Sequence, residues 1–267
     1  MAYQLADLLR VMERLRDPAT GCPWDVRQDF HSIVPSTLEE CYELAQAIEH
    51  EDYPHVAEEL GDVLFQVVFY AQLGREQSLF DFGGIVDGLV RKLLRRHPHV
   101  FRDGEIEGVV SERASVEAVK HSWEAIKQDE RQEKSQPGIL ADVPVALPAL
   151  PRAQKLQKRA ARVNFDWPDP AAVLAKMEEE IAELRVAMAA DSAADITEEM
   201  GDILFTGVNL ARKLGLDAES GLRHATAKFE RRFSAMESRA LEGGRPLAEC
   251  SAQQLDFLWE TVKRDGA

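Results

Sequence analysis

Cysteine is scarce in this sequence, and the scarcity argues against two kinds of structural framework. The three cysteines, Cys22, Cys41 and Cys250, lie far apart, and none belongs to a C-x-x-C pair. A disulfide scaffold needs paired cysteines, and a thiolate zinc site needs closely spaced ones. We therefore expect a hydrophobic core to hold the fold together, for which 45% hydrophobic residues are sufficient.

Long apolar runs are also missing. No stretch approaches the ~20 apolar residues that cross a bilayer, and the residues after Met1 include no basic segment followed by an apolar one. The sequence thus predicts neither a membrane span nor a signal peptide. We expect a cytoplasmic location and no membrane partner.

Positive charge is in short supply. The 267 residues include 32 Lys and Arg against 47 Asp and Glu, which gives a formal net charge of −15. Phosphate backbones and anionic membrane surfaces attract basic proteins, so we expect no nucleic-acid partner. A phosphate ligand is expected to bind together with metal ions.

Strand patterns are lacking, whereas helical periodicity is present nearly everywhere, so we predict an all-α fold. Ser36 and Glu39 fit a capping box, and Gly74 is expected to end the helix that follows. The helices are predicted over about 3–15, 37–49, 54–73, 82–96, 112–133, 152–162, 170–189, 192–214, 217–242 and 252–264.

A proline-rich segment divides the chain. Residues 135–151 hold four of the twelve prolines, which predicts a linker. The domains predicted on either side of it are residues 1–134 and residues 152–267.

The two sides of this segment repeat one another. Ala57–Phe65 recurs 140 residues later as Thr197–Phe205, with six of nine positions identical. Further along, the displacement falls to 136, where Trp123–Lys127 matches Trp259–Lys263. The chain is therefore interpreted as a tandem duplication of one helical bundle.

Acidic pairs recur at fixed spacing in both halves. Because residues i and i+3 share one helix face, E-x-x-E on one helix and E-x-x-D on the next can bring four carboxylates together if the helices pack antiparallel. Such carboxylates repel one another without a cation, and an all-oxygen set suits Mg²⁺ or Mn²⁺. The predicted metal ligands are Glu40, Glu43, Glu59 and Asp62 in the first half and Glu180, Glu183, Glu199 and Asp202 in the second.

The acidic pairs have two other interpretations. A single E-E-x-x-E is most often a solvated helix face, but a solvated face has no reason to keep its spacing through a duplication. A di-iron centre uses Glu-x-x-His motifs, and this chain has none. A metal site for hard cations is therefore favoured.

Each half also offers cations and a ring for a nucleotide. Two basic residues one helical turn apart can face an anion together or simply be solvated. A Trp-x-x-x-Lys pair can stack on a base and meet a phosphate, although such a Trp more often packs. The candidates are Lys92, Arg96, Trp123 and Lys127 in the first half and Lys228, Arg232, Trp259 and Lys263 in the second. With the carboxylates, they describe a nucleoside triphosphate site.

The halves differ at one position near the acids. Two helical turns beyond Asp202 the second half has Asn209, where the first half has Phe69. An amide suits contact with a sugar or a phosphate, whereas a phenylalanine ring would fill the same place with an apolar side chain. The second half is therefore favoured as the main catalytic unit.

At these residues the sequence resembles the MazG family of nucleoside triphosphate pyrophosphohydrolases in its tandem two-domain form. The resemblance covers almost the whole chain and includes Gly21–Asp25, Arg95–Phe101 and Lys228–Phe233. It implies an all-α bundle that forms a homodimer and hydrolyses NTPs and dNTPs, with Mg²⁺, to the monophosphate and pyrophosphate. Position by position, it also implies the eight acids named above as metal ligands.

A mechanism follows as a hypothesis. The carboxylates hold Mg²⁺ ions against the phosphates, and an activated water attacks the α-phosphorus. Glu179, or Glu39 in the first half, orients that water, accepts its proton or supports the ligands from behind. Lys228 and Arg232 neutralise the departing pyrophosphate.

Alternatives to a general pyrophosphohydrolase stay open on the sequence alone. One is a catalytically silent module that senses nucleotides or binds a protein. Another is a pyrophosphohydrolase dedicated to a single nucleotide, such as one with a modified base.

Overall fold

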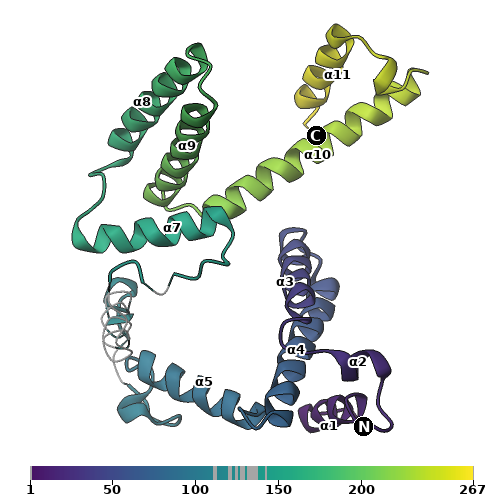
Figure 1. The fold of residues 1–267 in the computed structure, drawn as a ribbon, viewed down its shortest axis with the longest axis vertical. Helices are drawn as coiled ribbons and strands as arrows, with labels where there is room; N and C mark the ends of the chain where they lie inside the picture. Colours follow the sequence, from purple (N-terminus) through teal and green to yellow (C-terminus); the bar gives the residue numbers. More distant parts are fainter. Residues whose placement is uncertain are drawn as a thin grey trace. The chain divides into compact units, whose positions relative to one another are not determined.

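The structure is a computed structural model that describes residues 2–110, 113–119, 122, 123, 126, 130, 138–141 and 143–266 (Figure 1). Over these residues the regular secondary structure is helical, with one isolated bridge between Phe101 and Val109. The all-α prediction is confirmed. None of the described helices is long and apolar enough to cross a membrane.

The chain divides into two compact units, Met1–Glu130 and Arg131–Ala267. The first contains α1 (Leu5–Leu15), α2 (Pro23–Arg27), α3 (Val34–Glu49), α4 (Tyr53–Glu76), α5 (Phe82–Arg96) and the 3₁₀ helix η1 (Arg102–Gly104). The second contains α7 (Ala149–Ala160), η2 (Ala161–Val163), α8 (Pro170–Ala189), α9 (Ala193–Lys213), α10 (Ala218–Glu242), η3 (Leu247–Glu249) and α11 (Ala252–Arg264).

Two helical hairpins form the centre of the two units. In each, a three-residue turn joins two helices that pack along one another, α3 with α4 and α8 with α9. Glu51 and Asp191, 140 residues apart, both take the left-handed conformation in these turns, with φ of 55° and 53°. The duplication therefore extends to the backbone conformation of the turn.

A helix earlier in each unit braces the hairpin. α1 packs on α4, and α7 packs on α9. In the first unit this contact forms a core cluster of Met12, Ile33, Val68, Phe69 and Leu73. Apolar burial of this kind is the main stabilising contribution to the bundle.

The predicted capping box of α3 is wrong. The helix begins at Val34, two residues before Ser36, and its N-cap Ile33 makes no side-chain capping bond. Ile33 is 2% exposed in the core cluster, and Pro35 is tolerated in a first helical turn. Packing of Ile33 thus sets the start of the helix, and Ser36 lies inside it.

The predicted end of α4 at Gly74 is also wrong, since the helix continues to Glu76. Gly74 has a packing role instead. A Cβ atom there would lie 2.5 Å from the ring of Phe80, so only glycine lets the chain fold back this closely after the helix.

The other predicted boundaries mostly lie within a few residues of the observed ones. The short helix α2 was not predicted. Most of the helix expected over 112–133 lies outside the described residues, as does Lys127. The linker limits 135–151 stay a prediction, although α7 already begins at Ala149.

In the second unit α10 leads away from α8 and α9 (Figure 1). Its start is tied to α7, where Ala218 N donates to Gln154 Oε1 over 3.2 Å. α11 lies along its second half, where Arg239 pairs with Asp265 at 2.7 Å. The two helices form an arm beside the α8–α9 hairpin.

Candidate metal and nucleotide site

Three of the four predicted ligands of the first half come together where α3 and α4 pack. Oxygen atoms of Glu40, Glu43 and Glu59 lie within 4.8 Å of one another. Glu59 is buried, and its Oε2 has no hydrogen-bond partner in the described part of the chain. Asp62 is exposed one turn further along α4. Burial raises the pKa of Glu40, and the charge of Asp62 raises it further.

The second half repeats this arrangement on α8 and α9. Oxygen atoms of Glu180, Glu199 and Asp202 lie within 4.8 Å of one another. Partial burial raises the pKa of Glu199, and the charge of Glu183, the fourth predicted ligand, raises it further. All four predicted carboxylates of each half are therefore close enough to repel one another.

Both clusters fit a hard divalent cation. Their donors are all carboxylate oxygens, the type that Mg²⁺ and Mn²⁺ prefer. Burial, and then the charges of the neighbouring carboxylates, raise the pKa of Glu40 and of Glu199, and a cation would relieve the repulsion between these charges. The unpartnered Oε2 of Glu59 is a further acceptor without a donor.

The structure adds one residue to each cluster that the sequence analysis missed. Lys176 Nζ lies 2.9 Å from Glu180 and 2.7 Å from Glu179. In the first half, His55 Nε2 lies 2.5 Å from Glu59 Oε1. His55 and Lys176 each stand four residues before the buried acid that they contact, Glu59 or Glu180. This spacing places each pair on one helix face, so the contacts could have been predicted from the sequence.

The two candidate water-orienting acids differ from the buried ligands. Glu179 and Glu39 are both exposed at the surface of their helices. Glu179 is held by the ion pair with Lys176. Each is adjacent in sequence to a cluster residue, Glu180 or Glu40.

The cations and ring of the second half gather on the arm rather than at the acids. Lys228 and Arg232 lie on α10, and Trp259 and Lys263 lie on α11. The ring of Trp259 packs 5.7 Å from that of Phe229, and Lys263 pairs with Glu260 at 2.8 Å. Figure 1 shows this arm leading away from the hairpin that holds the acids.

The corresponding first-half residues also have protein neighbours. Arg96 pairs with Glu130 at 2.5 Å, and hydrogen bonds from Arg96 lower the pKa of Glu130 to about 2. Trp123 packs edge-on against His97, with ring centroids 5.1 Å apart. Lys92 is half-buried on α5.

Asn209 is buried beside an apolar cavity of the second half. Its side chain is 2% exposed, and Oδ1 accepts from Arg212 over 3.2 Å. The cavity, of about 560 Å³, lies between the end of α7, the loop before α8, and α9. Its lining includes Phe165, Trp167 and Phe205.

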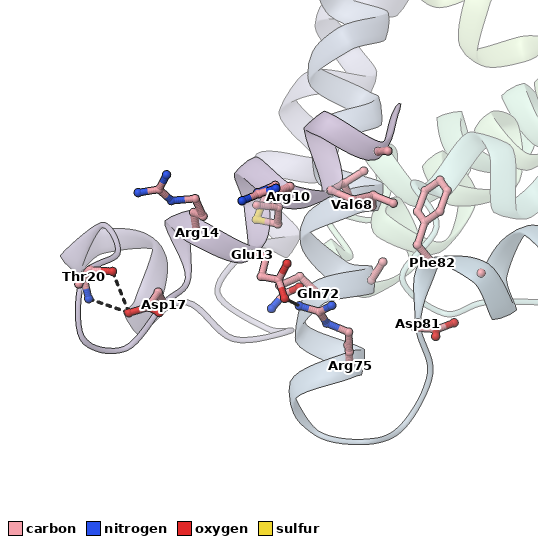
Figure 2. A pocket seen from close by; sticks show the side chains of 15 residues that line it. Arg10, Glu13, Arg14, Asp17, Thr20, Val68, Gln72, Arg75, Asp81 and Phe82 are labelled. Carbon is pink, nitrogen blue, oxygen red and sulfur yellow. Dashed lines mark hydrogen bonds and ion pairs between the residues drawn. The ribbon is translucent and has the colours of Figure 1, made fainter. Parts of the chain in front are cut away.

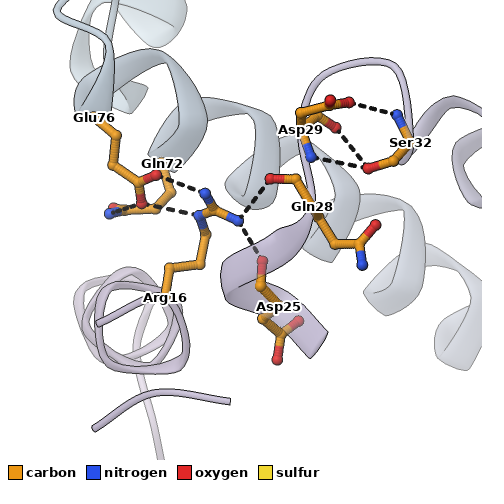
Figure 3. Close-up of polar contacts among 7 residues, drawn as sticks. All are labelled: Arg16, Asp25, Gln28, Asp29, Ser32, Gln72 and Glu76. Carbon is orange, nitrogen blue, oxygen red and sulfur yellow. Dashed lines mark hydrogen bonds and ion pairs between the residues drawn. The ribbon is translucent and has the colours of Figure 1, made fainter. Parts of the chain in front are cut away.

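In the first half the place of Asn209 is filled. Phe69 is fully buried, and the guanidinium carbon of Arg16 lies 5.2 Å from its ring centroid. Arg16 donates to both carboxylate oxygens of Glu76, over 2.9 and 2.6 Å, and to the backbone oxygens of Asp25 and Gln28 (Figure 3). These bonds hold the arginine in place.

A second cavity, of about 740 Å³, lies in the first unit between α1, α4 and the start of α5. Its rim is charged: Arg75 pairs with Glu13 at 2.6 Å, and Asp17 accepts from Thr20 over 2.7 Å (Figure 2). Neither Phe65 nor Phe69 lines it. This cavity is therefore not the counterpart of the one beside Asn209.

Comparison with known proteins covers both halves. The model of a family described as the MazG nucleotide pyrophosphohydrolase domain matches residues 28–101 and again residues 169–235. A nucleoside triphosphate pyrophosphohydrolase of Escherichia coli strain K12 is 47% identical over 98% of this chain and 97% of its own length. A protein of Thermotoga maritima named nucleoside triphosphate pyrophosphohydrolase/pyrophosphatase MazG is 42% identical over 96% of this chain and 94% of its own length.

Proposed function

The chain belongs to the MazG family, and we propose that it is a Mg²⁺-dependent nucleoside triphosphate pyrophosphohydrolase that converts NTPs and dNTPs to monophosphates and pyrophosphate. The observation that carries the proposal is the cluster of Glu180, Glu199 and Asp202, whose oxygens lie within 4.8 Å of one another. Mn²⁺ is the expected substitute for Mg²⁺. Full-length relatives that bear this activity in their names support the substrate class.

In each half, four carboxylates would hold the metal. When bound, Mg²⁺ supplies positive charge to the phosphate oxygens and acidifies a water for attack on the α-phosphorus. The ligands are Glu180, Glu183, Glu199 and Asp202 in the second half and Glu40, Glu43, Glu59 and Asp62 in the first.

Glu179 is proposed to orient the attacking water and to accept its proton. It directly precedes the proposed ligand Glu180 on α8 and is exposed, so it stays open to water. Lys176 bridges Glu179 and Glu180 and would keep both in position. Glu39 is the counterpart in the first half.

The second half is proposed as the main catalytic unit. It has the buried amide of Asn209 where Phe69 fills the first half. Lys228, Arg232 and the Trp259–Lys263 pair are proposed to meet the phosphates and the base in a homodimer. Support for the dimer comes from the arm, where Phe229, at 54% exposure, and Phe257, at 70%, leave apolar surface uncovered.

The decisive experiment separates the products. Several triphosphates are incubated with the full-length protein and Mg²⁺, and pyrophosphate and orthophosphate are measured separately. We expect pyrophosphate first, and none from the double variant Glu40→Gln with Glu180→Gln. Orthophosphate as the first product, or full activity of the double variant, contradicts the proposal; binding without turnover would favour a nucleotide sensor.

A further inference from the structure

The end of α5 in the first half carries three basic residues, Lys92, Arg95 and Arg96. Residues three and four apart share one helix face, so Lys92 lies on the same side of the helix as both arginines. Such a group of cations attracts an anion. The guanidinium fork of arginine fits the paired oxygens of a carboxylate and those of a phosphate group alike.

A carboxylate of the same chain already occupies the two arginines. Glu130 Oε1 accepts hydrogen bonds from Arg95 Nε over 3.0 Å and from Arg95 Nη2 over 2.6 Å. Arg96 donates from Nε to Oε1 over 3.2 Å and from Nη2 to Oε2 over 2.5 Å. Two guanidinium groups therefore converge on one carboxylate, in the way that they would converge on a phosphate group.

The contact is partly shielded from water. The side chain of Glu130 is 15% exposed, and that of Arg96 is 29% exposed. Hydrogen bonds from Arg96 lower the pKa of Glu130 to about 2, although burial opposes the shift. Glu130 is therefore ionised at neutral pH, and salt screens a partly buried pair less than a surface pair.

A second contact holds the segment that carries Glu130 at the same end of α5. The ring of Trp123, seven residues before Glu130, packs edge-on against His97, with ring centroids 5.1 Å apart. An acid on a segment that is already held in place loses little freedom when it pairs. Glu130 is thus a strong competitor for any anion that approaches the arginines.

The second half keeps the cations and lacks the acid. The three basic residues recur 136 positions later as Lys228, Arg231 and Arg232. The residue 136 positions after Glu130 is Gly266, which has no side chain. An anion that approaches the second group of cations therefore meets no counterpart of Glu130.

From this difference we infer that Glu130 takes the place of a phosphate group at the end of α5 and keeps the first half from binding a polyphosphate there. The ion pair is autoinhibitory, because its removal would leave the two arginines open to an anion. The inference rests on the proposed function, which assigns the matching cations of the second half to the triphosphate. It gives the inequality of the halves a second cause, separate from Phe69.

The test uses inorganic tripolyphosphate as the probe, without Mg²⁺, so that neither a base nor a metal takes part. Glu130→Gln keeps the shape of the side chain and removes its charge. A tethered group competes at an effective concentration of ~1 mM, so Glu130→Gln should bind tripolyphosphate at the first half at least about tenfold more tightly than the wild type does. Equilibrium dialysis against the full-length protein should then show one additional tripolyphosphate per chain.

Two variants control for the change in charge. Glu13→Gln also frees an arginine of the first unit, since Glu13 pairs with Arg75 at 2.6 Å, and it changes the net charge by the same amount. It should bind tripolyphosphate as the wild type does. Arg95→Ala combined with Glu130→Gln should remove most of the gain. An equal gain in Glu13→Gln, or a gain that survives Arg95→Ala, would overturn the inference.

The same variant separates autoinhibition from a purely structural role. If Glu130 only fastens its segment to α5, Glu130→Gln should lower the melting temperature and bind no more tripolyphosphate than the wild type. That result would contradict the inference. A gain in binding is not expected from a variant that fails to fold, so a positive result stands without a further control for folding.

Hydrolysis of dATP with Mg²⁺, measured on the same proteins, distinguishes this inference from the proposed function. If the wild type releases pyrophosphate but Glu130→Gln gains no binding of tripolyphosphate, the autoinhibitory role is wrong and the function stands. If no triphosphate is hydrolysed but Glu130→Gln gains binding as described, the function fails and the role of Glu130 stands.

Discussion

The two halves of the chain keep the same spacing of acids and diverge one to two helical turns beyond it. Both clusters present three carboxylates within 4.8 Å. Beyond Asp202 the second half opens an aromatic cavity, whereas beyond Asp62 the first half packs Phe69 against Arg16. The acidic cluster is thus kept in both copies, while an open cavity next to it is found in the second.

The difference also separates stability from function. Phe69 belongs to the core cluster of the first half, and Arg16 ties the end of α1 to α4 through Glu76. In the second half the same region is left hollow beside Asn209, at a cost in packing. The first half is therefore expected to be the more stable unit, and the second half is expected to be the catalytic one.

The largest effect on stability is expected when the buried ring of Phe69 is removed from the first half. Phe69→Ala removes a fully buried ring and should lower the free energy of unfolding by ~3–5 kcal/mol, as urea denaturation would measure. Asn209→Ala loses one hydrogen bond and should cost only ~1 kcal/mol while impairing dATP hydrolysis. Equal losses of stability in the two variants would break the comparison.

Substitution of the acids should affect the second half more than the first, and the quantity affected should be activity. Glu180→Gln should reduce kcat for dATP at least ~100-fold, because even residues that only orient metal ligands contribute ~10–100-fold. A 100-fold loss corresponds to about 2.7 kcal/mol. Glu40→Gln should change kcat little, and so should the control Glu178→Gln, an exposed acid on α8. Similar losses in Glu180→Gln and Glu40→Gln would show that both halves catalyse.

Arg16 offers a smaller effect with a matched control. Its side chain is 6% exposed, and it lowers the pKa of Glu76 by hydrogen bonding. Arg16→Ala should destabilise the protein by ~1–3 kcal/mol, because it leaves buried partners unsatisfied. The matched control is Arg75→Ala, which removes the surface pair of Arg75 with Glu13. It should lower the free energy of unfolding by at most ~1 kcal/mol. If thermal denaturation shows a larger loss of stability for Arg75→Ala than for Arg16→Ala, the stabilising role assigned to Arg16 is contradicted.

The smallest effect is a pH dependence in the second half. Burial tends to raise the pKa of Asp166, but hydrogen bonds from Lys213 and Arg212 outweigh it and lower the pKa below the ordinary value. A lowered pKa gives stability that is complete above the ordinary value, ~3.9, and is lost as the pH falls through the folded value. The stability difference between wild type and Asp166→Asn should be constant from neutral pH to about pH 5. The stability difference should become smaller below about pH 4. A difference that already becomes smaller near neutral pH would contradict the lowered pKa of Asp166.

Local sequence signals were enough for the hairpins and the acids. The spacing of Glu40, Glu59 and their counterparts fixes which helix face they share, so two E-x-x-E/D pairs can converge once the helices pack. Three acids of each half do so. The start of α3 was misplaced because a tertiary contact of Ile33 overrides a local capping signal.

The cavity and its filled counterpart were beyond the sequence. Arg16 and Glu76 are 60 residues apart in the chain, and no spacing rule links residues so distant. The cavity arises from a loop, a helix end and α9 meeting in space. Only the contrast between Asn209 and Phe69 pointed to it in advance.

The number of nucleotides bound per chain tests the asymmetry most directly. Equilibrium dialysis with Mg²⁺ and α,β-methylene dATP, which cannot release pyrophosphate, gives this stoichiometry. We expect one nucleotide per chain, lost in Glu180→Gln and retained in Glu40→Gln. Two nucleotides per chain, or a loss of binding in Glu40→Gln alone, would contradict the assignment of nucleotide binding to the second half.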